Sequence, residues 1–239
     1  MGFPFAGSFA RMMPMRYYPI FIKLTGQECL VVGAGQVGRR KIASLLESGP
    51  ARVLVVDTRP ADEELRELLA NPCIDYQTRT FRPEDVNGKT LVIASTDDED
   101  LNWTISNLCR DKGILCNIVD QPEKCSFIVP AVHRQGDLTL AVSTGGASPA
   151  LAKKIRKDLD EYFGRHYGAF LELMSRIRPL VIGRGRPTFE NTALFRELVD
   201  SDLLEAMERD DREGVVEILQ RILPQELESH IEELLRGLC

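Results

Sequence analysis

Short apolar runs alternate with segments of helical spacing over roughly the first half of the chain. The runs ECLVV, ARVLVVD, TLVIAS and ILCNIVD are rich in Val, Ile and Leu, and CIDYQTRTF can form a further strand. Helical segments separate these runs, and one of them spans residues 97–112 and ends at Gly113. Continuous apolar strands that alternate with helices are typical of a parallel sheet covered on both faces. The pattern therefore predicts an α/β doubly wound parallel sheet over residues 27–120.

The hydrophobic pattern changes after this region. The stretch SFIVPAVHRQGDLTLAVS alternates apolar and polar residues around Gly136, which predicts an antiparallel hairpin. Ser148 and Pro149 then suit the N-cap and the first position of a helix. From about residue 165 onward, leucines recur at helical spacing and no strand is expected. The sequence thus predicts a small strand-plus-helix segment followed by an all-helical C-terminal domain.

These patterns divide the chain into four predicted parts. Residues 1–14 are interrupted by Pro4, Gly7 and Pro14 and lack the sustained apolar core of a secretory signal, so we expect a disordered extension. The α/β domain is expected over residues 15–128 and the helical domain over 165–239. A dimerisation segment is expected over residues 129–164, because a lone hairpin is marginally stable in water.

Composition narrows the class of protein. The chain has 239 residues and a net charge of -6, which argues weakly against a nucleic-acid partner. No run approaches the roughly 18 apolar residues of a membrane span. The six cysteines form no CxxC pair, which favours reduced, mostly buried thiols in a cytoplasmic protein.

No metal site is predicted. The three histidines lie far apart in sequence, without HxH or HExxH spacing. His133 could come near the cleft, but a solvated hairpin position is favoured. Asp97, Asp98, Glu99 and Asp100 suit the first turn of a helix, whose partial positive charge they favour. Thr96, just before them, is a plausible N-cap of that helix.

A glycine motif stands directly between the first strand and the first helix. Gly33, Gly35 and Gly38 form GxGxxG, with Gln36 and Val37 inside the motif. Gly33 permits a tight turn, Gly35 lets the backbone approach a pyrophosphate, and Gly38 packs helix against strand. The helix N-terminus offers unpaired N–H groups to the phosphates. A strand–turn–helix with these glycines predicts a Rossmann-like nucleotide site, in which all five residues contact the cofactor.

An acidic residue ends the second strand. Asp57 lies 19 residues after Gly38, where a carboxylate accepts hydrogen bonds from the adenosine ribose and repels a 2′-phosphate. This predicts NAD as the cofactor, although Arg59 lies near enough in sequence to compensate for the repulsion. Thr58 and Thr96 follow the second and fourth strands and are further candidate cofactor contacts.

Asp120 follows the fifth strand, at the sheet edge where ligands of doubly wound folds bind. Two interpretations remain open from the residues alone. The carboxylate can cap the turn through Gln121 and Pro122. It can also face a nicotinamide and take the proton that accompanies hydride loss.

Three motifs occur in order along the chain: GAGQVGRRK, NIVDQPEKCSFIVPAV and LTLAVSTGGASPALAKKIR. Together they resemble precorrin-2 dehydrogenase, the N-terminal half of siroheme synthases, over roughly residues 15–165. The resemblance implies NAD-dependent oxidation of precorrin-2 to sirohydrochlorin by a homodimer, with Asp120 as general base. It also places Asn117, Thr144, Gly145, Gly146 and Lys153 at the substrate, although Thr144 stands where the family often has serine. The substrate carries eight carboxylates, and basic residues around the connector can meet them or form a solvated face: Arg134, Lys153, Lys154, Arg156 and Lys157.

Two other functions remain open. One is a bifunctional enzyme that also inserts Fe²⁺ or Co²⁺, as a substrate, into sirohydrochlorin. The other is a regulatory module that senses NAD without turnover, for which the glycine motif and Asp57 suffice. The motif succession after Asp120 favours the dehydrogenase over the sensor.

Overall fold

The computed structural model describes residues 16–119 and 121–238. The predicted extension, residues 1–14, lies outside this range, and so does Asp120. The described chain forms two compact units, which divide between Val129 and Pro130. Each unit is built around a hydrophobic core of its own.

The first unit is a five-stranded parallel sheet. Its strands are β1 (Glu28–Val32), β2 (Arg52–Asp57), β3 (Ile74–Thr78), β4 (Leu91–Ala94) and β5 (Leu115–Ile118). They lie in the order β3-β2-β1-β4-β5, and every neighbouring pair is parallel. The strand order reverses beside β1, which places the end of β1 at the topological switch point where ligands bind. The predicted doubly wound sheet is confirmed.

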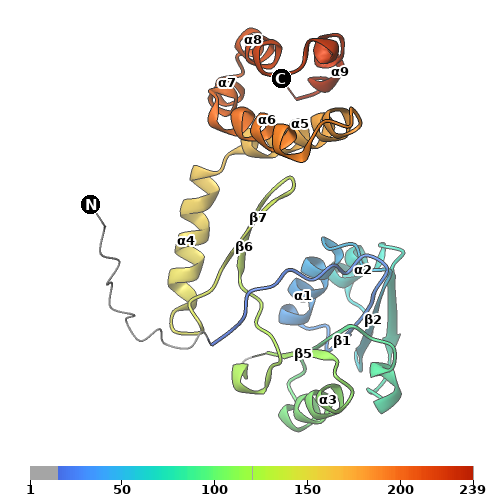
Figure 1. The fold of residues 1–239 in the computed structure, drawn as a ribbon. Coiled ribbons are helices and arrows are strands. Elements are labelled where there is room, and N and C mark those ends of the chain that lie inside the picture. The colour runs from blue at the N-terminus through green and yellow to red at the C-terminus, as the bar shows by residue number, and fades with distance from the viewer. Residues whose placement is uncertain (1–15, 120, 239) are drawn as a thin grey trace, which may run out of the picture. The chain divides into compact units, whose positions relative to one another are not determined.

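Helices cover both faces of this sheet (Figure 1). Helices α1 (Gln36–Leu46) and α2 (Glu63–Leu69) bury one face through residues such as Ile42 and Leu65. Helix α3 (Glu99–Asp111) and the 3-10 helix η1 (Pro83–Val86) bury the other through Ile105 and Val86. Because both faces are covered, the central strands are apolar at almost every position, as the sequence shows.

The start of α3 corrects one prediction. Asp98, and not Thr96, is the N-cap, because its Oδ1 accepts the N–H of Leu101 at 3.0 Å. The hydroxyl of Thr96 instead donates to Oδ1 of Asn102 at 2.8 Å. Asp98 is favoured at the cap because its charged carboxylate also interacts with the positive end of the helix.

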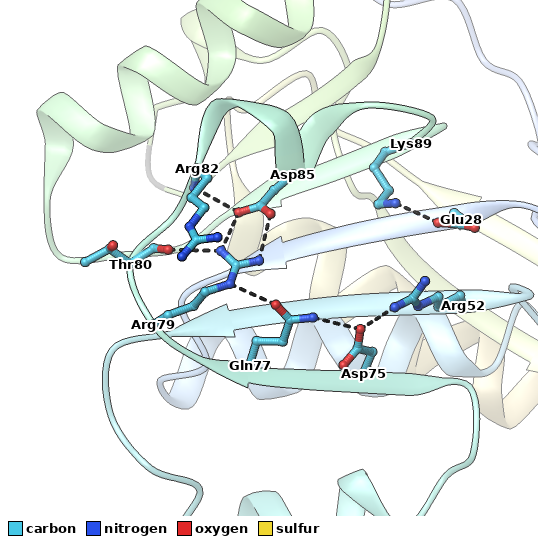
Figure 2. A network of polar contacts seen from close by, with 9 residues as sticks. All are labelled: Glu28, Arg52, Asp75, Gln77, Arg79, Thr80, Arg82, Asp85 and Lys89. Carbon is cyan, nitrogen blue, oxygen red and sulfur yellow. Dashed lines mark hydrogen bonds and ion pairs between the residues drawn. The ribbon is translucent and has the colours of Figure 1, made fainter.

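A polar network holds the segment after β3 (Figure 2). The guanidinium of Arg79 makes two bonds of 2.7 Å to the carboxylate of Asp85 and a third, of 2.8 Å, to Gln77. Gln77 continues the chain of bonds to Asp75, which also pairs with Arg52. The backbone N–H of Arg79 donates to the carbonyl of Asp57, so this network begins beside the end of β2.

The second unit starts with the predicted hairpin. Strands β6 (Ala131–Gln135) and β7 (Leu138–Val142) are antiparallel, and Gly136 in the two-residue turn has a φ of 57°. This left-handed conformation favours glycine. Helix α4 (Pro149–Tyr162) follows, and Ser148 caps it by accepting the N–H of Leu151 at 3.2 Å. Both the hairpin and the Ser148 cap are confirmed.

His133 differs from its prediction. It is not solvated but only 4% exposed on β6, and its Nδ1 lies 2.6 Å from Oδ1 of Asp160 on α4. Arg156 binds the other oxygen of Asp160 at 2.7 Å. His133 faces the helix because β6 alternates its side chains, so that its neighbour Arg134 is turned outward.

The rest of the second unit is helical in the described residues. Its helices are α5 (Arg165–Ile182), α6 (Thr188–Asp200), α7 (Leu203–Glu208), α8 (Arg212–Ile222), the 3-10 helix η3 (Gln225–His230) and α9 (Ile231–Leu234). Their apolar faces meet in one core around Leu173, Ile177 and Leu219, each fully buried. None of the helices in residues 16–119 and 121–238 combines the length and apolarity that crossing a membrane requires.

Candidate cofactor-binding site

The glycine turn joins β1 to α1 with almost no spare space. Gly33 has a φ of 91°, and a Cβ on it would lie 2.6 Å from the carbonyl oxygen of Ser95. A Cβ on Gly38 would overlap the carbonyl oxygen of Gly33. The tight turn and the close packing of helix on strand therefore both require glycine, which agrees with the geometry expected from the motif.

Gly35 is different, because its surroundings are open. A Cβ built there would meet nothing nearer than a guanidinium nitrogen of Arg59, at 3.5 Å. Gly35 is also the N-cap of α1 and has no side chain to bond the first amides of the helix. The N–H groups of Gln36 and Val37 lie in that first turn, and an anion at this point would be met by them. The turn thus fits the pyrophosphate of a dinucleotide.

Asp57 ends β2 beside this turn. Its Oδ2 accepts the N–H of Ala34 at 2.6 Å, and its Oδ1 accepts the N–H of Arg59 at 2.8 Å. Burial alone raises the pKa of Asp57, but these two N–H groups and the Arg59 guanidinium outweigh it and hold the pKa below its ordinary value. The ionised carboxylate keeps a lone pair on each oxygen, which can accept a ribose hydroxyl.

Arg59 brings a positive charge to the same place. Its Nε lies 3.5 Å from Oδ1 of Asp57, and its side chain is 67% exposed. The hydroxyl of Tyr76 holds the backbone of this residue by donating to its carbonyl at 2.6 Å. Thr58, between the two charged residues, is exposed. The site therefore has both a carboxylate that opposes a 2′-phosphate and a guanidinium that attracts one.

The loop after β4 packs against the glycine turn. Ser95 donates its hydroxyl to the carbonyl of Gly33 at 2.8 Å. Asn102 is buried and donates to the carbonyl of Thr96 at 2.9 Å. Sequence reasoning singled out Thr96 but missed Ser95 and Asn102, although the position of Ser95 directly after a buried strand was a usable signal. These bonds fix the loop against the glycine motif.

The end of β5 carries another anchored segment. Asn117 is buried and donates to the carbonyl of Phe127 at 3.0 Å. Cys125, which sequence reasoning did not select, bonds through its sulfur to the backbone of Ile118 and Gln121. Asp120 itself lies outside the described residues, so its role as base stays a prediction.

The other predicted substrate residues belong to the second unit. Gly145 and Gly146 have φ values of 62° and 87°, so the loop before α4 uses conformations that favour glycine. The hydroxyl of Thr144 accepts the N–H of Ser148 at 3.1 Å, and Lys153 is exposed on α4. The structure shows a shaped glycine loop at a helix start, and its role in substrate binding stays a prediction.

Among the described residues, no group of three His, Cys, Asp or Glu side chains is placed to hold a metal ion. The described cysteines are free thiols, and Cys29, Cys109 and Cys116 are buried.

Two family models match the chain. Residues 20–131 match a family described as putative NAD(P)-binding, and residues 135–162 match the central region of sirohaem biosynthesis proteins. The first match covers the whole sheet and its glycine turn, and confirms the predicted nicotinamide dinucleotide cofactor. The second covers β7 and the whole of α4, including Thr144 and Lys153.

Curated relatives are siroheme synthases. The chain is 37% identical to the siroheme synthase of Thioalkalivibrio sulfidiphilus over 90% of this chain and 44% of the relative. It is 33% identical to siroheme synthase 1 of Aeromonas salmonicida over 93% of this chain and 47% of the relative. The chain thus spans about half the length of the siroheme synthases that it matches.

A solved structure of similar extent is a precorrin-2 dehydrogenase. Its fold superposes with a TM-score of 0.72 at 25% sequence identity, over 86% of this chain and 98% of that one. The fold of this chain, with its parallel sheet, hairpin and helical region, is therefore shared with almost the whole of that structure.

Proposed function

The chain belongs to the precorrin-2 dehydrogenase and siroheme synthase N-terminal family, and we propose that it oxidises precorrin-2 to sirohydrochlorin with NAD as the hydride acceptor. The single observation that carries the proposal is the glycine turn at the switch point of the sheet, with Asp57 bonded to its Ala34 amide. In this arrangement the α1 amides hold the pyrophosphate and Asp57 holds the adenosine ribose.

The oxidation removes a hydride and a proton from the substrate. The nicotinamide, when bound, accepts the hydride. Asp120, two positions after the last residue of β5 in the sequence, takes the proton as general base. We assign the shaped loop of Thr144, Gly145 and Gly146, with Asn117 and Lys153, to binding of the polycarboxylate substrate.

The test is anaerobic incubation of the full chain with precorrin-2 and NAD. We expect NADH to form in step with the change in the tetrapyrrole absorption spectrum. Asp120→Asn should lower turnover by about 10²–10⁴-fold, the usual contribution of a general base, while NAD still binds. Asp111→Asn, an exposed residue at the end of α3, is the matched control and should leave turnover unchanged.

Two results would contradict the proposal. NAD binding without any NADH formation in the presence of precorrin-2 would indicate a sensing module. Near-normal turnover of Asp120→Asn would leave the oxidation standing but return Asp120 to a turn cap.

We further propose that the chain forms a homodimer through the hairpin. The β6–β7 sheet has only two strands, so both of its outer edges present backbone groups that a second copy can pair. Sedimentation at micromolar concentration should give a dimer. Ala141→Glu, at an exposed position of β7, should shift it toward monomer, whereas Ala193→Glu on α6 should not. Monomeric, fully active protein would refute this assembly. A cytoplasmic location stays a prediction.

A further inference from the structure

Helices α5 and α6 line an open surface cavity of about 480 Å³ in the second unit. This volume lies within the range of small-molecule pockets. The cavity is formed by the C-terminal half of α5 and one side of α6, and it is lined by Arg178, Ile182, Thr188, Asn191, Thr192, Phe195, Arg196, Val199 and Asp200. None of these residues takes part in the cofactor site.

One wall of the cavity is apolar and open to solvent. Ile182 is 52% exposed and Val199 is 58% exposed, although both belong to helices whose other faces are fully buried. Phe195 belongs to the same lining and is only partly buried against the core. Exposed apolar side chains grouped around a hollow mark a binding surface, because a ligand there removes their area from water.

Two arginines line the same cavity without a carboxylate partner among the described residues. The guanidinium carbon of Arg178 lies 4.9 Å from the centre of the Phe195 ring. Such stacking uses the face of the guanidinium and leaves its N–H edge available to a planar anion. Arg196 makes no ion pair in the described chain either, whereas Arg176 and Arg184 of the same unit are paired with glutamates.

The remaining polar groups fix the sign of the ligand charge. Asp200 is the one carboxylate in the lining, so the two guanidinium groups leave the cavity with a net positive charge. Helix α6 also begins here, at Thr188, with no side chain bonded to its first amides. The cavity therefore combines an apolar wall with unpaired cationic donors.

We propose that this cavity binds a small organic anion, a carboxylate or sulfonate carried on a flat apolar ring system. The ring lies against Phe195 and Val199, and the anionic group meets Arg178 and Arg196. An inorganic anion would leave the apolar wall exposed, and a neutral ring would leave both arginines unpaired. The proposal does not depend on the oxidation of precorrin-2, since the cavity lies wholly within α5, α6 and their connection.

The test uses the full chain and two dyes that differ by one charged group. The anion is 1-anilinonaphthalene-8-sulfonate, and the neutral control is N-phenyl-1-naphthylamine, which has the same rings without the sulfonate. We expect the sulfonate dye to bind with enhanced fluorescence and to remain bound when NAD is added in excess. The neutral dye should bind more weakly.

Substitutions of opposite sign sharpen the test. Arg178→Gln and Arg196→Gln should each weaken binding of the sulfonate dye by about twofold to fivefold, as expected for exposed charge pairs. Asp200→Asn should strengthen it, because it removes the one repelling carboxylate. Arg221→Gln on α8, an exposed arginine outside the cavity, should change nothing. The substitutions of Arg178, Arg196 and Asp200 should each change the affinity for the neutral dye less than the affinity for the sulfonate dye.

Three results would overturn the proposal. In the first, NAD displaces the sulfonate dye, which would place it in the first unit. In the second, the affinity for the dye is the same in Arg178→Gln, Arg196→Gln and Arg221→Gln. In the third, dye fluorescence falls as the protein concentration rises, which would show that a second copy of the chain occupies the cavity.

Discussion

The sulfur of Cys125 lies 3.1 Å from the backbone nitrogen of Ile118 and accepts its N–H. The same sulfur lies 3.2 Å from the carbonyl oxygen of Ile118 and 3.3 Å from that of Gln121. One thiol thus binds the backbone on both sides of Asp120. On the other side of the segment, the hydroxyl of Ser106 donates to the carbonyl of Lys124 at 2.8 Å.

We predict that Cys125→Ala lowers turnover by about tenfold with little change in NAD affinity, because a loosely held base loses its alignment with the substrate. Cys125→Ser should recover part of the rate, since a hydroxyl can donate and accept in the same place. The ammonium of Lys124 lies 4.5 Å from the centre of the Trp103 ring, so a loosened segment should also change tryptophan fluorescence.

Cys73→Ala is the matched control for this prediction, because Cys73 is a half-buried thiol before β3. It should change neither the rate nor the fluorescence. Normal turnover in Cys125→Ala, together with an unshifted tryptophan spectrum, would show that the thiol does not position the segment.

Cofactor preference depends on two side chains of opposite charge. Asp57→Asn keeps an oxygen for the Ala34 amide but removes the negative charge, so the preference for NAD over NADP should narrow by about tenfold, or roughly 1.4 kcal/mol. Arg59→Ala should widen the preference, because it removes the charge that attracts a 2′-phosphate. The measurement is kcat/KM with each cofactor.

Arg66→Ala, an exposed residue of α2, serves as the control for charge and should leave the ratio unchanged. Equal efficiency with both cofactors in the unmutated protein would remove the assignment of Asp57 as the discriminating residue.

Much of the fold follows from local pattern, whereas the site depends on distant contacts. The strands and the glycine turn were predictable because apolar runs and GxGxxG act over a few neighbouring residues. The partner of His133 was not, because Asp160 lies 27 positions away and only the packing of α4 on β6 brings them together. The bond of Asp57 to Ala34 likewise spans 23 positions and requires the register of β1 on β2.

Single-residue choices at element ends were also beyond the sequence. Thr96 and Asp98 are both acceptable N-caps, and only the path of the chain after β4 selects Asp98. Cys125 gave no signal because its sulfur bonds to backbone atoms, which every residue carries.

The Arg79–Asp85 pair predicts a response to acid. Asp85 has a side chain only 9% exposed. Burial alone would raise its pKa, but the bonds from Arg79 and from the amide of Arg82 outweigh it and lower the pKa. A lowered folded-state pKa stabilises the fold above the unfolded value of about 3.9, and the stabilisation is lost as pH falls through the folded-state pKa.

Asp85→Asn should therefore lower the free energy of unfolding at neutral pH by about 1–3 kcal/mol, and the difference from the unmutated chain should shrink below about pH 4. Urea unfolding at a series of pH values measures both. Asp75→Asn, in the same network but more exposed, should cost less. A stability difference between the two chains that grows on acidification would contradict this role of the Arg79–Asp85 pair, which Figure 2 shows.

Metal insertion into sirohydrochlorin is the remaining question about the proposed activity. Insertion requires groups that accept two pyrrole protons, and it needs no resident metal site. Asp120 can accept one proton. A second base could be a histidine, but His133 is buried and its Nδ1 lies 2.6 Å from Oδ1 of Asp160, so this contact holds it in the packing of β6 on α4. We therefore predict weak or no chelatase activity.

The measurement supplies sirohydrochlorin with Fe²⁺ or Co²⁺ without oxygen and follows the absorption spectrum against a control without enzyme. The unmutated chain and Asp120→Ala should both insert metal at close to the uncatalysed rate. Insertion as fast as the oxidation, and lost in Asp120→Ala, would establish instead that one carboxylate serves both reactions and that the chain is bifunctional.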